Sequence, residues 1–502
     1  MLVIMLVAPP LGAMAADGGI GLDAQIERLA HPLWTARVDA AEAIAGFGSE
    51  GRAAIPALVA TLDDTEIRVR RAIVPALAAV GDGSDEAVSG LVLALSDPDW
   101  VVRRKAALSF EEVGGGNIAV DAIRPLFGAE STAVQTAAAL ALAGLAPASR
   151  AAVPELATAL SASDWQLRAA AAQALGELGA EAAAALPALA AALRDRDWGV
   201  AEQVVEALSQ IGAPALPVLV EALSDANLPV RWGAARALGR IGAEARPAVD
   251  ALAGLLDDPA MQARWAAAKS LEAIESDAAA AIPELAAALD DDAWVVRWAA
   301  ARALGAVAAE PHLDTVVNSL AAALRDRDSR VCEAAAFALE RVGSRGAAAI
   351  DALSVASAHG RGDSPDACQV IDVGPAAEQV LMESGWTVRW AAVRALGVVG
   401  EGRAEALPPL SAALDDDQWQ VRGVATLAVG GFGELATRPI ISDLAEGLDD
   451  EHPAVRKATL IALRELGSSA AFTVTAVRAA VNDADETVRE AARETLRDFE
   501  GT

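Results

Sequence analysis

Tyrosine is absent from the 502 residues, and histidine and cysteine are rare, with four and two copies. The histidines are scattered and none is followed by glutamate, so neither a zinc site nor a histidine-based catalytic triad is indicated. A phosphate-binding loop is also missing, because Gly114-Gly115-Gly116 lacks the lysine and Ser/Thr partners of such a loop. We therefore expect a protein that is not an enzyme and that has no metal or cofactor.

Basic residues are few relative to acidic ones. The chain has 40 lysines and arginines and 70 aspartates and glutamates, so its net charge is −30. A protein that binds nucleic acid usually has a basic face and a basic balance. The composition argues against nucleic acid as a general partner.

One unit recurs along nearly the whole chain, with a period of mostly 33 residues. In Val296-Arg297-Trp-Ala-Ala-Ala-Arg-Ala-Leu-Gly305 the first arginine serves as the anchor of the repeat. The anchors are Arg37, Arg70, Arg103, Gln135, Arg168, Ala201, Arg231, Arg264, Arg297, Cys332, Arg389, Arg422, Arg456 and Arg489. Self-similarity at this period indicates stacked units that cannot bury a core alone, and it favours binding along an extended surface over catalysis.

Each repeat is predicted to be an antiparallel helix pair. In the copy 281–305, Pro283 suits the first turn of a first helix, which ends near Leu289. The aspartates that follow are placed to cap a second helix, from about Trp294 to Gly305. We predict an all-α, right-handed α-solenoid of about 14 such pairs.

A proline, an aspartate eight residues later and an arginine six after that resemble the HEAT-repeat signature, as in Pro283/Asp291/Arg297. The sequence motif V-R-x-A-A-x-x-A-L-G is similar to that of the phycobilin-lyase-type bacterial HEAT repeats. The resemblance covers about residues 20–500 and implies a general scaffold. It also implies a ladder of aspartates and arginines between neighbouring repeats, with gaps at Ala129, Gln135, Ala162 and Ala201.

The 11 tryptophans occupy two places in the repeat. Seven lie three residues before the anchor, and we expect them to wedge between adjacent repeats: Trp34, Trp100, Trp165, Trp198, Trp294, Trp386 and Trp419. Four follow the anchor directly, each with a cation four residues later on the same helix face. These pairs are Trp232/Arg236, Trp265/Lys269, Trp298/Arg302 and Trp390/Arg394.

We call these eight residues the stripe. In HEAT stacks the second helix lines the concave surface, so the stripe is predicted to bind a protein partner or an extended anionic or carbonyl-rich ligand. The alternative is that the pairs stack between neighbouring helices and stiffen the stack.

A gap of 57 residues between the anchors Cys332 and Arg389 marks an insertion. Two helices are predicted in it, Ala347–Ala358 and Pro375–Glu383, around a loop that contains Arg361-Gly362-Asp363. That tripeptide resembles the integrin-binding loop of adhesive proteins, but in a chain this rich in these residues chance explains it better. Cys332 and Cys368 either form a disulfide in an exported protein or remain two thiols.

The N-terminal apolar run ends in Ala13-Met14-Ala15, the pattern of a signal-peptidase site, although a basic segment before it is missing. We expect export to the periplasm or the medium, or a cytoplasmic protein if the run is not a signal peptide. No apolar stretch reaches transmembrane length, so no membrane anchor is expected. The expected organisation is a signal peptide at 1–15, repeats at 16–353, an inserted loop at 354–374, and repeats with a C-terminal cap at 375–502.

The function that these observations favour is a non-catalytic scaffold. Two alternatives remain open. One is a lyase or chaperone for bilins or other tetrapyrroles, which the subfamily resemblance implies. The other is an adhesion protein that uses the loop 361–363.

Overall fold

The computed structural model describes residues 21–358 and 384–501. These residues are 81% helical and contain no strand. This confirms the all-α solenoid predicted from the repeat. The signal-peptide segment, the Arg361–Asp363 loop, Cys368 and the predicted helix 375–383 lie outside the described residues.

The chain divides into two compact units, Met1–Leu219 and Val220–Thr502. Unit 1 contains six helix pairs in its described part. The first helices of its pairs are α1 (Leu22–Arg28), α3 (Ile55–Thr61), α5 (Asp85–Ala94), α7 (Gly116–Ile123), α9 (Val153–Ala159) and α11 (Leu186–Ala192). The second helices are α2 (Trp34–Ala45), α4 (Ile67–Gly81), α6 (Trp100–Val113), α8 (Thr132–Gly144), α10 (Trp165–Glu177) and α12 (Trp198–Ile211).

In unit 2 the first helices are α15 (Val249–Leu255), α17 (Ile282–Ala287), α19 (Leu313–Ala323), α21 (Ile350–Ser357), α24 (Leu407–Ala412), α26 (Arg438–Glu446) and α28 (Val474–Ala480). The second helices are α14 (Leu228–Ile241), α16 (Met261–Ile274), α18 (Trp294–Val307), α20 (Ser329–Val342), α23 (Ser384–Val399), α25 (Trp419–Gly430), α27 (Pro453–Leu466) and α29 (Glu486–Gly501). Helix α13 (Leu216–Ala222) contains the boundary between the units.

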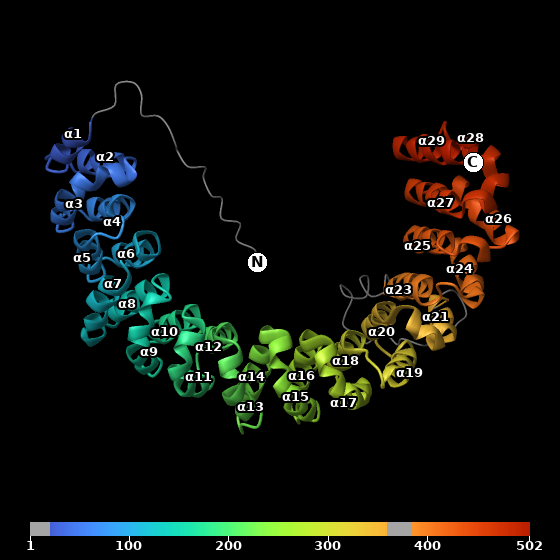
Figure 1. Cartoon of the computed structure of the whole chain (residues 1–502), viewed down its shortest axis with the longest axis horizontal. Helices are drawn as coiled ribbons and strands as arrows, with labels where there is room; N and C mark the ends of the chain where they lie inside the picture. The colour runs from blue at the N-terminus through green and yellow to red at the C-terminus, as the bar shows by residue number, and fades with distance from the viewer. Residues whose placement is uncertain (1–20, 359–383, 502) are drawn as a thin grey trace, which may run out of the picture. The chain divides into compact units, whose positions relative to one another are not determined.

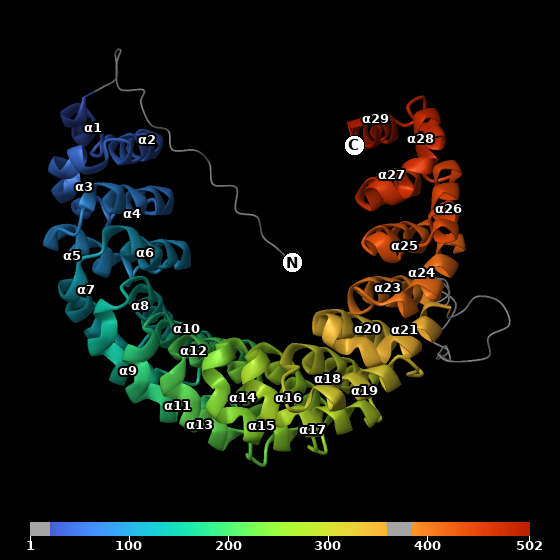
Figure 2. The ribbon, with the colours of Figure 1, turned by 45° about the vertical axis from the view of Figure 1, so that its right-hand side comes forward.

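Within each unit the second helices pack side by side in one row. In unit 2 this row lies on the inner side of the bend that the helix pairs follow, and the first helices lie outside it (Figures 1 and 2). Small residues allow the close approach. A Cβ on Gly305 of α18 would lie 2.7 Å from the Cα of Ala338 in α20, so this contact requires glycine. Leu304 beside it is fully buried.

Short 3-10 helices join the repeats, an element that the helix-pair prediction did not include. The longer ones are Gly48–Ala54, Ala148–Ala152, Gly179–Ala185, Gly242–Ala248, Glu275–Ala281, Gly343–Ala349 and Gly467–Thr473, and shorter ones are Ala213–Ala215, Ala404–Ala406 and Gly433–Leu435. Others extend the first helices, namely Arg124–Gly128, Ala288–Asp290, Ala413–Asp415 and Gly447–Asp449. The joining segments are rich in alanine and show no periodic pattern of apolar and polar residues. From the sequence they were therefore not distinguished from loops at the helix ends.

The predicted ladder of aspartates and arginines is present. Arg264 donates from Nε and Nη2 to the two carboxylate oxygens of Asp291 in the next repeat, at 2.5 and 2.9 Å. Its Nη1 donates to the carbonyl of Asp258 in its own repeat at 2.9 Å. Burial would raise the pKa of Asp291, but the hydrogen bonds from Arg264 and from the backbone of Ala293, together with the charges of Arg264 and Arg297, outweigh it and lower that pKa. Each arginine thus ties its own loop to the following repeat.

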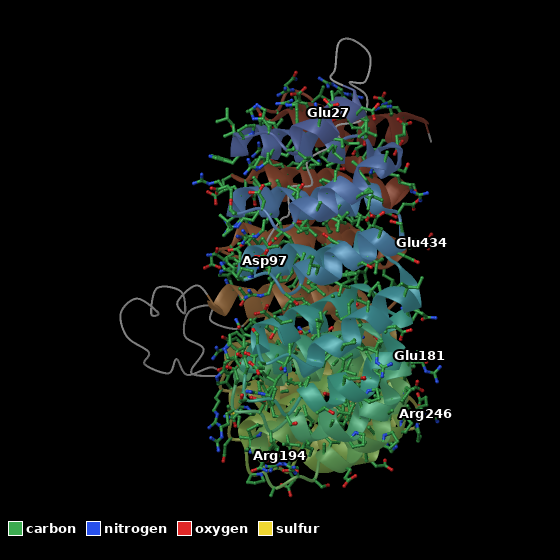
Figure 3. The ribbon with its side chains drawn as sticks, turned by 90° about the vertical axis from the view of Figure 1, so that its left-hand side faces the viewer. Glu27, Asp97, Glu181, Arg194, Arg246 and Glu434 are labelled. Carbon is green, nitrogen blue, oxygen red and sulfur yellow. The ribbon has the colours of Figure 1, made fainter. Side chains whose placement is uncertain are left out.

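The described residues contain three such rungs in unit 1 and six in unit 2. In unit 1 the rungs are Arg37–Asp64, Arg70–Asp97 and Arg168–Asp195. In unit 2 they are Arg231–Asp258, Arg264–Asp291, Arg297–Asp326, Arg389–Asp416, Arg422–Asp450 and Arg456–Asp483. Asp97 lies along one edge of unit 1, and Glu181 of a joining segment lies along the opposite edge (Figure 3).

At one predicted gap in the ladder, Gln135 replaces part of the hydrogen bonding of an anchor arginine. The side-chain amide of Gln135 donates to the carbonyls of Ala129 and Phe127, at 2.8 and 3.1 Å, as an arginine would within its own loop. Ala162 in the next repeat offers no carboxylate. A hollow of about 580 Å³, lined by both Gln135 and Ala162, lies at this point.

The capping of the second helices differs from the prediction for the copy 281–305. The N-cap residue of α18 is Ala293, which has no side-chain cap. Asp291 faces the ladder and accepts from the backbone N–H of Ala293 at 2.8 Å. Where the residue at this N-cap position is aspartate, as at Asp99 of α6, its carboxylate does cap the helix. Hydrogen bonds from Arg71 and from the helix lower the pKa of Asp99 to about 2.

One helical stretch, Pro453–Ala480, is long and apolar enough by length and composition to cross a membrane. It comprises α27, the 3-10 helix Gly467–Thr473 and α28. Its Arg456 forms a ladder rung with Asp483. Because charged residues interrupt it, the sequence did not present it as a continuous apolar run.

The described parts of the insertion and of the C-terminus add two facts. Helix α21 continues to Ser357, so the first residues of the predicted loop 354–374 are helical. Helix α29 packs on α27, and Arg464 of α27 pairs with Glu494 of α29 at 2.7 Å.

Candidate binding site on the second helices of unit 2

The stripe residues lie on four second helices of unit 2, which are α14, α16, α18 and α23. Each tryptophan follows its anchor arginine, so the ladder fixes where the indole emerges from the helix. All four tryptophans are half-buried. An aromatic ring in this state has one part packed against the stack and another part available to a ligand.

Three of the four predicted pairs form within one helix. Arg236 lies over the ring of Trp232, with its guanidinium carbon 4.7 Å from the centroid. The corresponding distances are 4.9 Å for Arg302 and Trp298, and 5.5 Å for Arg394 and Trp390.

The fourth predicted pair requires a correction. Lys269 lies over Trp298 of the next repeat, at 5.5 Å, and not over Trp265 of its own helix. Its ammonium group also contacts Glu272 of its own helix, 2.5 Å away, and Glu272 pairs in turn with Arg302 of α18. Lys269 and Trp265 nevertheless line the same hollow.

Helix α20 has an acidic residue at the tryptophan position of the stripe and an aromatic residue at the cation position. A search for tryptophans could not find this helix. Its anchor is Cys332, so Glu333 takes the place of the tryptophan and Phe337 that of the cation. The ring of Phe337 meets that of Trp390 edge to face, with centroids 5.9 Å apart. A search of the same two positions in every repeat would have found both residues.

A second set of ion pairs, which the sequence reasoning missed, joins the inner row. Arg302 pairs with Glu272 of the preceding helix at 2.7 Å, and Arg394 pairs with Glu340 of α20 at 2.9 Å. Both acids lie eight residues after their anchors. The cations of the stripe therefore hold neighbouring second helices together as well as covering the indoles.

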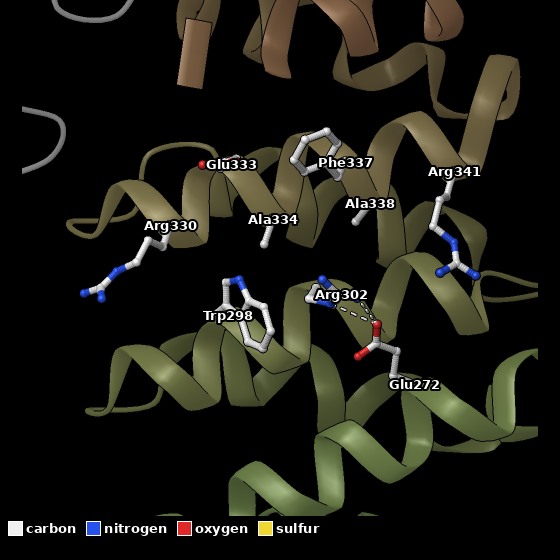
Figure 4. A pocket seen from close by; sticks show the side chains of 9 residues that line it. All are labelled: Glu272, Trp298, Arg302, Arg330, Glu333, Ala334, Phe337, Ala338 and Arg341. Carbon is white, nitrogen blue, oxygen red and sulfur yellow. Dashed lines mark hydrogen bonds and ion pairs between the residues drawn. The ribbon is translucent and has the colours of Figure 1, made fainter. Parts of the chain in front are cut away.

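Two adjoining hollows open along this row. Hollow A has a volume of about 380 Å³ and is lined by Glu272, Trp298, Arg302, Arg330, Glu333, Ala334, Phe337, Ala338 and Arg341. Trp298 and Arg302 project toward α20 from below, and Phe337 lies opposite them (Figure 4).

Hollow B has a volume of about 410 Å³ and is lined by Arg236, Gly239, Arg240, Trp265, Ala266, Lys269, Ser270, Glu272, Ala273, Glu275 and Arg341. It shares Glu272 and Arg341 with hollow A. The prediction thus found five of the residues that line the two hollows, namely Arg236, Trp265, Lys269, Trp298 and Arg302. It missed the arginines 240, 330 and 341 and the acids.

The pKa values of two carboxyl groups in hollow A are shifted in opposite directions. Burial would raise the pKa of Glu272, but hydrogen bonds from Arg302 and Lys269 outweigh it and lower that pKa. Glu272 is therefore an ion whose charge two cations share. Burial raises the pKa of Glu333, and a hydrogen bond with Thr387 opposes this only in part.

A second prediction also requires correction. The tryptophans at the starts of the second helices were expected to wedge between adjacent repeats, and several do not. In unit 1, Trp100, Trp165 and Trp198 are 61%, 50% and 67% exposed. In unit 2, Trp294 lies under the guanidinium of Arg330, and Trp419 stacks on His452 with ring centroids 3.8 Å apart.

Cys332 is buried, and its thiol donates to the carbonyl of Asp326 at 3.2 Å. That carbonyl is the one an anchor arginine would bind. Since Cys368 is not among the described residues, the disulfide remains a prediction. Residues 21–358 and 384–501 contain no cluster of histidine, cysteine or acidic side chains that could hold a metal ion.

Comparison with protein-family models matches the sequence to HEAT repeats over residues 22–111, 120–186, 153–227, 186–272, 216–305, 252–340 and 282–363. Residues 388–416 match the PBS lyase HEAT-like repeat. A search of curated proteins found no match.

Solved structures with the same fold include members of the importin-β group. Kap95p in a complex with RanGDP superposes with a TM-score of 0.52 at 14% identity, over 95% of this chain and 77% of that chain. Kap121p bound to RanGTP gives 0.60 at 12%, over 95% of this chain and 56% of that chain. Yeast importin-β alone gives 0.52 at 15%, over 96% and 70%. At these identities the likeness shows the fold only.

Proposed function

Because this chain belongs to the HEAT-repeat family, we propose that it is a non-catalytic scaffold that holds a protein partner along the second helices of unit 2. The observation that carries the proposal is the pair of adjoining hollows A and B, lined by half-buried tryptophans and by arginines. Tryptophan and arginine are the residues most enriched at binding hot spots.

The stack of helix pairs supports this proposal. A row of second helices presents the same backbone positions at regular intervals, which suits a partner that lies across several repeats. Kap95p and Kap121p, which share the fold, hold Ran in solved complexes. We extend to this chain the capacity to hold a protein, and not the identity of that partner.

The function of the stripe can be separated from its structural role by peptide display on the full-length chain. Random-sequence peptides are selected on the wild type and on the variant Trp232→Ala, Trp265→Ala, Trp298→Ala. We expect peptides that the wild type enriches to be lost on the triple variant, with affinities at least about a hundredfold weaker, because each tryptophan contributes contact area. Helicity and melting temperature should change little.

The matched control removes three exposed tryptophans from unit 1, with Trp100→Ala, Trp165→Ala and Trp198→Ala. This variant should keep the enriched peptides. If the wild type enriches none, or if the stripe variant melts far below the control, the stripe is part of the packing between repeats and the proposal is wrong.

A further inference from the structure

We propose that hollows A and B form one track for an acidic, extended peptide segment, whose carboxylates lie about three residues apart. The inference rests on the proposed function and names the chemistry of its ligand. It also assigns the central contact to Arg341 of α20, a residue outside the stripe.

The charges that line the track favour an anionic ligand. Six cations line the two hollows, and only three carboxylates accompany them, Glu272, Glu275 and Glu333. The charge of Glu272 is already shared between Arg302 and Lys269. This local excess of positive charge is opposite in sign to the net charge of the chain, which is −30. A carboxylate that enters it gains charge-assisted hydrogen bonds.

Arg341 differs from the other cations of the track. Arg302 is paired with Glu272, and Arg330 is paired with Asp328 at 2.7 Å. Arg341 is exposed and lines both hollows. Its side chain projects from α20 toward the neighbouring second helices, and it lines the same hollows as Glu272 (Figure 4). A guanidinium with five donors in this position can bind a carboxylate that lies where the two hollows meet.

The repeat sets the spacing of the ligand. Neighbouring helices pack about 8–10 Å apart, and an extended peptide advances about 3.3 Å per residue. A peptide that crosses the row therefore passes one second helix for about every three residues. Carboxylates at every third position would meet the cations of α14, α16, α18 and α20 in turn, and Arg341 of α20 also lines hollow B.

The same cations could contact the phosphates of a nucleic acid. The acidic surface of the chain repels a long polyanion, whereas a short peptide segment places its charges only in the track. We therefore assign the track to a peptide and treat an oligonucleotide as an outcome of the test.

The test measures fluorescence anisotropy of labelled peptides on the full-length chain. One peptide has glutamate at every third position, a second holds the same glutamates side by side, and a third has glutamines in their place. We expect the first to bind about tenfold more tightly than the second and about a hundredfold more tightly than the third. Raising the salt concentration should weaken the first most.

The variant Arg341→Gln should weaken the first peptide about tenfold and leave the glutamine peptide unchanged. The matched control is Arg246→Gln, which removes an exposed arginine of unit 2 from a joining segment outside the track (Figure 3). This control should bind like the wild type.

The two proposals fail in different ways. If the peptides enriched by display are neutral or basic, and glutamate and glutamine peptides bind alike, the track binds peptides but is not selective for acids. If a single-stranded oligonucleotide binds more tightly than the peptides and loses its affinity in Arg341→Gln, the ligand class assigned here is wrong. If no peptide binds at all, the proposed function fails with it.

Discussion

Unit 1 and unit 2 both carry tryptophan three residues before the anchor, but the exposure of the ring differs from repeat to repeat. In unit 2 the ring of Trp294 is covered by Arg330, which lies two residues before the next anchor. In unit 1, Trp34 is covered in the same way by Arg68, at 4.7 Å. The next repeats after Trp100 and Trp165 have Ala133 and Gly199 there, and both rings are exposed.

The exposure of a residue in this stack thus depends on the neighbouring repeat as much as on its own. The same holds for the inner row. In the positions that carry Trp298 and Arg302 in α18, helix α6 of unit 1 has Arg104 and Leu108, and Leu108 is 58% exposed. A run of consecutive repeats with matching residues makes a surface, whereas an isolated copy does not.

The largest expected difference is between two rungs of unequal depth, one in each unit. Arg389 and Asp416 in unit 2 are 4% and 0% exposed, whereas Arg37 and Asp64 in unit 1 are 14% and 10% exposed. Asp416→Ala leaves a buried arginine without its main counter-ion, and we expect a loss of about 3–5 kcal/mol in the free energy of unfolding. Urea unfolding followed by circular dichroism measures it.

Two controls calibrate that loss. Asp64→Ala in unit 1 should cost about 1–2 kcal/mol, because water can reach the arginine that remains. Asp417→Ala removes an exposed partner of Arg389 and should cost less than about 1 kcal/mol. Equal losses for Asp64→Ala and Asp416→Ala would mean that burial does not set the strength of the rungs.

A smaller effect should follow from adding to unit 1 the rung that it lacks between α8 and α10. The double variant Gln135→Arg, Ala162→Asp places the ladder pair beside the hollow of about 580 Å³. We expect it to stabilise the chain by about 1–2 kcal/mol, since the new pair joins two repeats through charge-assisted hydrogen bonds. A double variant no more stable than the sum of its single variants would contradict a coupled rung.

The smallest predicted effect concerns Glu275, which occupies a position where other repeats have glycine. Glu275 has φ 59° and ψ −138°, close to Gly242 at 71° and −136°, in a region that suits glycine. Glu275→Gly should therefore stabilise the chain by about 1 kcal/mol. It should also tighten acidic peptides, because a carboxylate leaves hollow B. The thermal midpoint and peptide anisotropy measure the two effects, and Gly242→Ala, which should destabilise, is the opposite control.

The period, the anchors and the turn residues were sufficient to predict the helix pairs and the ladder. The reason is local, because proline at helix starts, glycine at helix ends and an apolar face every three or four residues act within one repeat. The cation over each tryptophan was also readable for Trp232, Trp298 and Trp390, where both residues belong to one helix.

What the sequence by itself determined is the architecture: an all-helical stack, its repeat length and the rungs that join its units. The tertiary structure alone decided which side chains of neighbouring repeats meet. It turned Lys269 toward Trp298, placed Arg341 and Glu272 on the lining of the same hollows, and left Trp100 uncovered. These outcomes depend on the angle and distance between adjacent second helices, which small residues such as Gly305 set through packing. A pattern read within one repeat does not contain that information.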